Sequence, residues 1–390
     1  TYMESTLKRT WAEISLDNLT HNFETIRRQV GPKAKLLGVV KADAYGHGAV
    51  RVAKHLERLG AGYLAVSNLD ECEELRVNGI TLPILMLGFT PADQAERILK
   101  NDMTQAVPNL AIAEAYSSAA VHAGGTMKVH IKLDTGMGRL GFQCDDAHFD
   151  ASLRDILKIL ALPGLDVEGV FTHFCVSDEA ADECVEFTKI QHNRFLRMID
   201  AAETQGNFRF RLHHCCNAGG IASYPEWAWD MVRCGIILYG SGDLAEKMGM
   251  QPVMSLKTRV ATIKDFAAGE PISYGRTYFT QRPSRIAVLP IGYADGLHRA
   301  LSNQIEVLTP YGRAKQVGRI CMDMCMIDVT DLPQVKSGDE VEIFGEHILC
   351  ADDAALCDTI PYELMCAVSK RVPRVYRLNG VPVDKNLQPL

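Results

Sequence analysis

The sequence predicts an α/β plus β protein, with an N-terminal (β/α)8 TIM-like barrel followed by a C-terminal β-rich domain. Three observations lead to this prediction. The 390 residues are enough for a barrel of about 250 residues and a smaller second domain. From about residue 33 to 240, short apolar runs alternate with segments of helical period. After about residue 250, β-like runs separated by Pro, Gly and Asp turns predominate.

Eight apolar runs are the expected barrel strands, because parallel strands are buried on both faces and read as nearly continuous apolar segments. They span 35–41, 63–67, 83–87, 105–107, 127–134, 166–173, 209–214 and 231–233. Helical patterns lie between them at 71–77, 92–99, 111–119 and 186–202. A doubly wound sheet is the alternative, but no GxGxxG follows the first run.

The second domain is expected to hold strands at 285–291, 304–309, 325–329 and 340–344, and helical pattern returns at 351–369. Near residues 240–249 the alternation of strand and helix patterns gives way to mainly strand patterns. This change divides the chain into a barrel domain, 12–245, and a β domain, 246–390.

Composition excludes several classes of function. A net charge of −7 gives no general attraction to nucleic acid or to an anionic membrane. No run approaches the roughly 18–20 apolar residues that span a bilayer, and no signal peptide is visible. The 12 cysteines are irregularly spaced and form no CxxC pair, which predicts reduced thiols, no metal site and a cytoplasmic location.

Charged and polar residues fall at the ends of several predicted strands. In the run 127–134, the apolar residues alternate with His130, Lys132 and Asp134, which are therefore expected to point inward. Lys41, His173, His214 and Arg233 also fall at strand ends, where barrel chemistry collects. Converging cations suit an anionic ligand. Lys41 is a candidate for a Schiff base, a chemistry that aldolases and pyridoxal phosphate (PLP) enzymes share.

The segment VVKADAYGHG (39–48) resembles the alanine racemase family, and the resemblance continues in order to about residue 376. The other matching blocks are LDTGMGRLGF (133–142), THFCVSDE (172–179), HCCNAGGI (214–221), VRCGIILYG (232–240), PISYGRTY (271–278), IGYADGLHR (291–299), GRICMDMCMIDVT (318–330) and SKRVPRVY (369–376). The resemblance implies a PLP-bearing barrel, a β domain with which residues 1–11 pack, and a head-to-tail homodimer that shares its active sites. It implies a small amino-acid substrate and the interconversion of L- and D-alanine, which supplies D-alanine for peptidoglycan.

Roles follow from matching positions. Lys41 is expected to hold PLP and to act as the base on one face of the substrate Cα. Tyr274 is expected to be the base on the other face, reaching the barrel of the other subunit. Arg233 matches the arginine at the PLP pyridine nitrogen; because arginine keeps its proton, the ring nitrogen is expected to stay unprotonated. His173 and His214 match the histidines behind Arg233.

The remaining matches complete the expected site. Arg139 corresponds to the arginine that binds the substrate carboxylate, and Lys132 to a lysine that is carbamylated in many members. Tyr45, Gly235 and Ile236 match phosphate contacts, whereas Asn217 and Tyr362 are further phosphate candidates from the residues alone. The substrate loop of the partner is matched by Met322 and Asp323, and the access corridor by Asp178, Tyr293, Arg299 and Arg319.

Two positions depart from the family pattern. Ala218 follows Asn217 where the family often has a serine that donates to the phosphate. Lys370 replaces the tyrosine of SYRVPR, which touches the phosphate and narrows the substrate pocket. This second change leaves a serine or mixed alanine/serine racemase as an alternative, since a pocket rejects an added hydroxyl by only ~100-fold.

Three other classes of protein are weighed against the racemase. A fold-related PLP decarboxylase is disfavoured by Arg233 and Tyr274, since it is expected to have a glutamate and a cysteine there. A non-enzymatic PLP carrier normally lacks the β domain. An aldolase-like barrel would bind no PLP.

Overall fold

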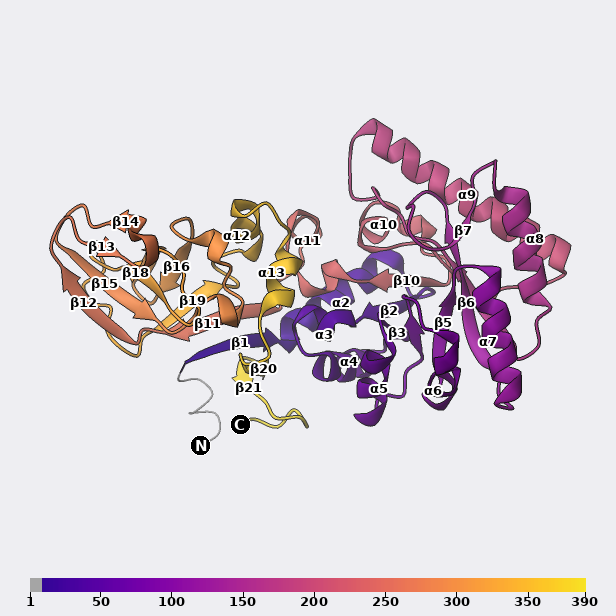
Figure 1. Cartoon of the computed structure of the whole chain (residues 1–390), viewed down its shortest axis with the longest axis horizontal. Coiled ribbons are helices and arrows are strands. Elements are labelled where there is room, and N and C mark those ends of the chain that lie inside the picture. Colours follow the sequence, from indigo (N-terminus) through magenta and orange to yellow (C-terminus); the bar gives the residue numbers. More distant parts are fainter. Residues whose placement is uncertain (1–8) are drawn as a thin grey trace. The chain divides into compact units, whose positions relative to one another are not determined.

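The computed structural model of the chain describes residues 9–390, which form two compact units (Figure 1). Residues 23–44 and 49–238 form the barrel unit. Residues 9–22, 45–48 and 239–390 form the β unit. The described part of the chain thus starts in the β unit, passes through the barrel unit and returns to the β unit. Residues 1–11 were expected to pack with the β domain. Residues 9–11 belong to the β unit, and residues 1–8 lie outside the described residues.

The barrel unit contains eight parallel strands in the order β10-β2-β3-β4-β5-β6-β8-β9. They are β2 (Lys35–Val39), β3 (Tyr63–Val66), β4 (Ile84–Met86), β5 (Met103–Val107), β6 (Met127–Asp134), β8 (Leu165–Phe171), β9 (Leu212–His214) and β10 (Met231–Cys234). Two backbone hydrogen bonds, from Asp230 N to His213 O (3.2 Å) and from Arg233 N to Cys216 O (2.9 Å), link β9 to β10. The barrel is therefore nearly closed, as the sequence predicts.

Helices surround these strands on the outside (Figure 1). They are α4 (Ala49–Arg58), α5 (Leu69–Val77), α6 (Ala95–Lys100), α7 (Leu110–His122), α8 (Phe149–Leu160), α9 (Asp182–Gly206) and α10 (Ala218–Ser223), while α2 (Leu16–Val30) begins in the β unit. Asparagine side chains cap three of them: Asn68, Asn109 and Asn217 each accept a hydrogen bond from a first-turn backbone N–H of α5, α7 and α10. Such caps stabilise a helix by about 1 kcal/mol.

The β unit is built on a ten-stranded sheet in the order β12-β15-β18-β17-β16-β19-β11-β1-β20-β21. Its strands are β1 (Thr10–Ser15), β11 (Met254–Arg259), β12 (Thr262–Phe266), β15 (Ser284–Leu289), β16 (Glu306–Thr309), β17 (Gly312–Gln316), β18 (Cys325–Asp328), β19 (Glu340–Phe344), β20 (Arg374–Leu378) and β21 (Val381–Pro382). Figure 1 shows the indigo arrow of β1 beside the orange β11 and the yellow β20. β1 pairs antiparallel with β11 and parallel with β20.

The structure adjusts some predicted bounds. The predicted strand 35–41 ends at Val39, and Lys41 begins a helical turn. The helical region 351–369 is two short helices, α12 (Cys350–Leu356) and α13 (Pro361–Ala367). Strands β1, β11, β12, β17 and β20 were not predicted individually.

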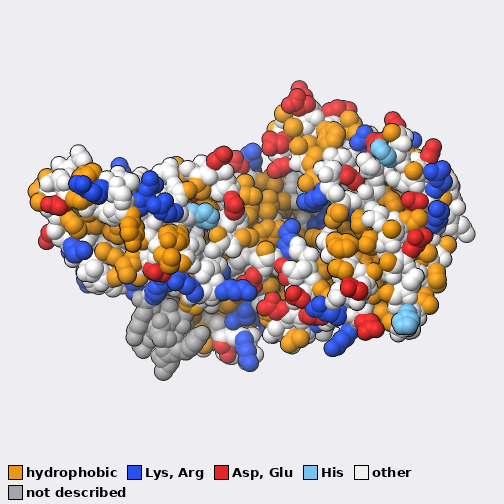
Figure 2. Space-filling view, in the orientation of Figure 1, with side chains coloured by type: hydrophobic (Ala, Val, Ile, Leu, Met, Phe, Trp, Pro, Cys, Tyr) orange, Lys and Arg blue, Asp and Glu red, His pale blue; other side chains and the backbone are white. Residues whose placement is uncertain are grey.

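The surface carries the mixture of acidic and basic side chains that the sequence composition indicates. On the face drawn in Figure 2, basic and acidic side chains are interspersed and form no continuous basic stripe. Within residues 9–390, no helix is both long and apolar enough to cross a bilayer.

Candidate active site

Lys41 is the first residue of α3 (Lys41–Tyr45), a single turn directly after β2. The backbone of residues 42–45 is left-handed, with φ between 51° and 54°. A left-handed helical conformation costs an L-residue roughly 1–2 kcal/mol, so tertiary contacts must hold this turn in place. One such contact is the hydrogen bond that Ala42 N donates to Glu71 Oε1 (2.8 Å). The turn therefore fixes the point from which the Lys41 side chain leaves the backbone.

The YGHG motif (45–48) is held by the β unit, to which it belongs. Arg374 Nε donates to Gly46 O (3.0 Å), and the Tyr376 hydroxyl donates to His47 O (2.8 Å). The two glycines have φ of 82° and 93°, in the region that glycine adopts without a steric cost. Strand β20, which lies far along the chain, therefore holds residues 45–48 in place.

Tyr45, a predicted phosphate contact, packs in an aromatic cluster of the β unit. Its ring centroid lies 4.8 Å from that of Tyr239 and 5.8 Å from that of Tyr362. Burial is the main cause that raises the pKa of the Tyr45 hydroxyl, and the nearby Cys366 raises it further. The hydroxyl therefore stays neutral and can donate a hydrogen bond. Tyr362, the other phosphate candidate, donates its hydroxyl to Ser241 O.

Arg233 is buried in the barrel and held on several sides. Its Nη2 donates to Thr172 O (2.7 Å) and Cys215 O (3.3 Å), and its Nη1 donates to His214 Nδ1 (2.9 Å). His173 Nδ1 lies 3.3 Å from Nη2. Burial, its largest cause, lowers the pKa of Arg233 to about 10, so the guanidinium remains charged at neutral pH. The structure thus brings the predicted His173, His214 and Arg233 together.

The donor chemistry of Arg233 sets the protonation of a chain of buried side chains. Arginine only donates, so His214 Nδ1 accepts and the proton of His214 is on Nε2. His214 Nε2 is 2.9 Å from His130 Nδ1, which must accept, and His130 Nε2 then donates to Glu168 Oε2 (2.8 Å). The hydroxyl of Tyr63 donates to the same oxygen (2.7 Å). Each histidine is thereby neutral and fixed in one tautomer.

The pKa values of this chain agree with that assignment. Burial lowers the pKa of His130 and lowers that of His214 well below its ordinary value. Burial by itself raises the pKa of Glu168, but hydrogen bonds from His130 and Tyr63 outweigh it and lower that pKa to about 2. A carboxylate at one end and a guanidinium at the other therefore enclose two neutral imidazoles. We refer to Arg233, His214, His130, Glu168 and Tyr63 as the barrel relay.

Cations gather around His173 at the strand ends. Burial lowers the pKa of His173 well below its ordinary value, and the charges of Arg233, Lys132, Arg139 and Lys41 lower it further. Within residues 9–390, neither Lys132 nor Arg139 nor Arg233 forms a salt bridge. An anion bound here would offset this concentration of positive charge.

Lys132 is the most deeply buried lysine of this group. Its Nζ lies 5.1 Å from the centroid of the Phe171 ring and donates to Leu133 O (3.3 Å). Burial, with the charges of Arg233 and Arg139, lowers the pKa of Lys132 to about 7. A large share of this amine is therefore neutral and nucleophilic at neutral pH. Arg139 is exposed in the loop after β6.

Four other residues predicted for the site lie in loops or at helix starts of the barrel unit. Gly235 and Ile236 follow β10, where Ile236 starts a 3-10 helix, and Asp178 is exposed after β8. Asn217 caps α10 through its side-chain oxygen and donates from its amide to Phe174 O (3.0 Å). Its amide nitrogen also lies 3.4 Å from His173 Nε2, so Asn217 adjoins His173 as well as capping α10.

In the β unit, three residues predicted for the second base, the substrate loop and the access corridor are exposed. The side chains of Tyr274, Met322 and Tyr293 are 69%, 54% and 43% exposed. Ser273, with φ of 68°, donates its hydroxyl to the backbone oxygen of Arg319 (2.6 Å) and so holds the turn that carries Tyr274.

The remaining β-unit residues occupy defined places. Asp323 accepts from Arg371 Nη2 (2.6 Å), and Arg371 Nε also donates to buried Asp295 (2.8 Å). Tyr293 and Arg299, predicted for the access corridor, line one cavity of about 360 Å³. Lys370 is exposed.

Glu168 and Tyr63 belong to the barrel relay but were not predicted from the sequence. Glu168 is an acid within a predicted buried strand, 166–173, and that signal could have singled it out. Tyr63 gives no comparable signal, since an aromatic residue in a buried strand is ordinary core.

Comparison with known proteins agrees with this architecture. Residues 14–243 match the family described as alanine racemase, N-terminal domain, and residues 253–376 match alanine racemase, C-terminal domain. The chain is 44% identical to alanine racemase 2 of Caldanaerobacter subterraneus subsp. tengcongensis over 97% of both chains. It is 46% identical to the alanine racemase of Desulfovibrio desulfuricans over 94% of this chain and 97% of that one.

Solved structures give the same result. The alanine racemase of Clostridium difficile 630 superposes with a TM-score of 0.91 at 41% identity, covering 96% of this chain and 97% of that one. The alanine racemase of Bacillus anthracis with bound L-Ala-P superposes with a TM-score of 0.87 at 34% identity, covering 97% of both.

The nearly closed parallel barrel, the β-rich unit and these matches together place the protein among the isomerases that act on amino acids. More specifically, the chain belongs to the alanine racemase family.

Proposed function

We propose that this protein interconverts L- and D-alanine, with PLP as cofactor and with one base on each face of the substrate Cα. The observation that carries the proposal is the group of cations, Lys41, Lys132, Arg139 and Arg233, whose charges act together on His173. The named relatives are alanine racemases, and they do not favour the serine alternative. The product would supply D-alanine for peptidoglycan, in the cytoplasm.

The residues present fit PLP. Lys132, Arg139 and Arg233, which form no salt bridge within residues 9–390, suit its phosphate and phenolic oxygen. Lys41 offers an amine at the end of a barrel strand. Tyr45, Gly235, Ile236 and Lys370 would hold the phosphate. When bound, PLP acidifies the substrate α-proton by drawing electrons from Cα. Arg233, which keeps its proton, would donate to the pyridine nitrogen and leave that nitrogen without a proton of its own.

The two bases would act from different subunits. Lys41 Nζ would remove or deliver the α-proton on one face, and the hydroxyl of Tyr274 would do so on the other. Tyr274, Met322 and Tyr293 are exposed in this chain, which supports a homodimer that covers them and shares its sites. Arg139 would orient the substrate carboxylate, while Met322 and Asp323 would bound the pocket from the partner. Asp178, Tyr293, Arg299 and Arg319 would line the access corridor.

Subunit mixing tests this arrangement. Lys41→Ala and Tyr274→Phe homodimers should each be nearly inactive. After unfolding and refolding together in equal amounts, half of the dimers are mixed and carry one intact site of two, so activity should return to about a quarter of wild type. No return of activity would contradict a shared site.

The cofactor is tested separately by a covalent label. Borohydride reduction of the PLP-loaded protein should fix PLP on the peptide containing Lys41, as measured by mass spectrometry. Label on a different lysine, or none, would contradict the assignment of Lys41.

Lys370 tests substrate choice. Lys370→Tyr restores the family residue, and a narrower pocket should raise the ratio of kcat/KM for alanine over serine by about tenfold, within the range for pockets that differ by a small group. An unchanged ratio would remove Lys370 from the determinants of specificity.

A further inference from the structure

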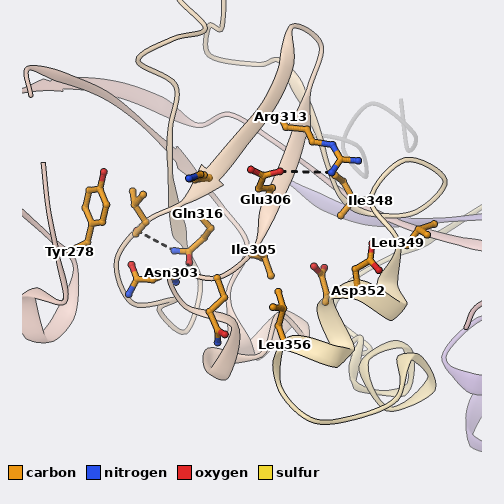
Figure 3. A pocket seen from close by; sticks show the side chains of 14 residues that line it. Tyr278, Asn303, Ile305, Glu306, Arg313, Gln316, Ile348, Leu349, Asp352 and Leu356 are labelled. Atoms are coloured by element: carbon orange, nitrogen blue, oxygen red, sulfur yellow. Dashed lines mark hydrogen bonds and ion pairs between the residues drawn. The ribbon is translucent and has the colours of Figure 1, made fainter. Parts of the chain in front are cut away.

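A cavity of about 400 Å³ lies in the β unit among β16, β17 and α12 (Figure 3). None of its lining residues belongs to the site described above. Its walls are partly apolar, with Ile305, Ile348, Leu349 and Leu356 contributing hydrocarbon surface. This size and lining are typical of a pocket for a small organic molecule.

Asp353, on α12, also lines this cavity and is only 4% exposed. Its Oδ2 atom is buried and has no hydrogen-bond partner within residues 9–390. A buried carboxyl group normally has hydrogen-bond or ionic partners, because its desolvation is costly. Asp353 therefore lacks the partner that its burial calls for.

The charges around the cavity favour a cation. Glu306, Asp352 and Asp353 are acidic, and Arg313 and Lys315 are basic. The dashed line in Figure 3 joins Arg313 to Glu306, an ion pair of 3.8 Å. The carboxylates of α12 have no such pair in the described part of the chain. Lys315 is exposed.

We propose that this cavity is a second ligand site, which binds a small organic cation with N–H donors, an alkylammonium or alkylguanidinium, through the Asp353 carboxylate. The hydrocarbon part of the ligand lies against Ile305, Ile348 and Leu356. The ligand supplies the positive charge and the hydrogen-bond donor that Asp353 lacks. This site is separate from the racemase reaction and does not depend on it.

n-Butylguanidinium is the probe, because a guanidinium does not condense with the aldehyde of PLP under neutral conditions. Binding to the PLP-loaded protein is measured by titration calorimetry at pH 8, with uncharged n-butylurea as the control ligand. n-Butylguanidinium should bind at a single additional site, and n-butylurea at least tenfold more weakly. Equal binding of the two ligands, or no binding of either, would overturn the proposal.

Asp353→Asn tests the carboxylate with almost no change of shape. This variant should fold with an equal or higher Tm at pH 8, because it removes a buried charge, and should bind the probe at least tenfold more weakly. Glu306→Gln removes the same charge from the same cavity, but at a residue already paired with Arg313. It should change binding by less than threefold. Equal losses in both variants would indicate a diffuse acidic surface and overturn the assignment to Asp353.

A crystal soaked with n-butylguanidinium locates the probe. Density for the guanidinium within hydrogen-bond distance of Asp353 is expected. Density only elsewhere would contradict the site.

Discussion

At the scale of single residues, Arg233 is held by a chain of hydrogen bonds in which every donor points the same way, from Arg233 toward Glu168. Because Arg233 can only donate, His214 and His130 each pass a hydrogen bond onward, and the carboxylate of Glu168 ends the chain. Any effect of Glu168 on the reaction would therefore pass through the side chains between it and Arg233. Glu168 is a positioning residue for the predicted contact of Arg233 with PLP.

Replacing Glu168 tests this relay. Glu168→Ala leaves the buried Nε2–H of His130 without its acceptor. Because an unpaired buried donor is costly, the relay should shift and hold Arg233 less firmly, and kcat should fall by at least tenfold. Glu168→Gln keeps an acceptor oxygen and should stay within about threefold of wild type. The ¹⁵N chemical shift of His130 Nε2 should report a hydrogen-bonded N–H in wild type and Glu168→Gln, and an N–H without that bond in Glu168→Ala.

A matched control for Glu168 exists within the barrel. Glu203 accepts from His213 Nε2 (3.0 Å), a similar acid–histidine pair that does not contact Arg233. Glu203→Ala should lower Tm with little change in kcat. Equal losses of kcat in Glu168→Ala and Glu203→Ala would reduce Glu168 to a structural role.

Lys132 gives a pH-dependent prediction. Its pKa of about 7 makes the neutral amine increasingly abundant as pH rises through 7, and only the neutral amine reacts with CO₂ to give a carbamate. In ¹³C-bicarbonate, a carbamate resonance should grow between pH 6 and 8 and be absent in Lys132→Ala. A resonance that persists unchanged in that variant would assign the carbamate elsewhere.

At the scale of elements, the turn after β2 is where local preference and the fold disagree. The sequence predicts a strand through residue 41, and alanines favour a right-handed helix, yet residues 42–45 are left-handed. The hydrogen bond from Ala42 N to Glu71 and the bonds from β20 to YGHG hold this conformation. Information of this kind is not local, so a single sequence could not provide it.

The cost of the turn is measurable at Ala42, which is exposed and has φ of 51°. Ala42→Gly should stabilise the protein by about 0.5–1 kcal/mol, because glycine adopts positive φ without steric cost. Ala151→Gly, at an exposed position of right-handed α8, should instead destabilise it by about 0.5–1 kcal/mol. Thermal unfolding measures both, and destabilisation of the same size at Ala42 would contradict the strain.

The strands themselves were largely predictable. The eight barrel strands are buried on both faces, so each appears as an apolar run, and the observed bounds differ from the predicted ones by only a few residues. Short strands of the β unit, such as β12 and β17, are half exposed and polar. They bury few apolar side chains, so neither appears as an apolar run, which explains why sequence patterns missed them.

At the scale of the whole molecule, β1 is an inner strand of the ten-stranded sheet. It pairs with β11 on one side and with β20 on the other, and Trp11, Ala12 and Ile14 are fully buried. The β unit therefore depends on a segment from the opposite end of the chain. The resemblance implied that the N-terminal residues pack with this domain, but periodicity in residues 10–15 alone did not.

Fragments test this dependence. Residues 239–390 alone lack β1, leave β11 and β20 without their shared neighbour, and should aggregate or remain unfolded. Fusing residues 9–22 to the front of this fragment through a flexible linker should restore cooperative unfolding, as measured by circular dichroism. The same fusion with Trp11→Asp should not. Cooperative folding of 239–390 by itself would contradict the requirement for β1.

The position of β1 also sets an order of events during synthesis. Thr10 lies opposite Thr258 in the register, and Ala12 lies opposite Arg374. β1 is made before β11 and β20, so it can pair with both only after the residues up to Leu378 have left the ribosome. Contacts across such long stretches form slowly. In the interval the barrel unit can complete its own ladders, while Trp11 and Ile14 remain uncovered and open to chaperones.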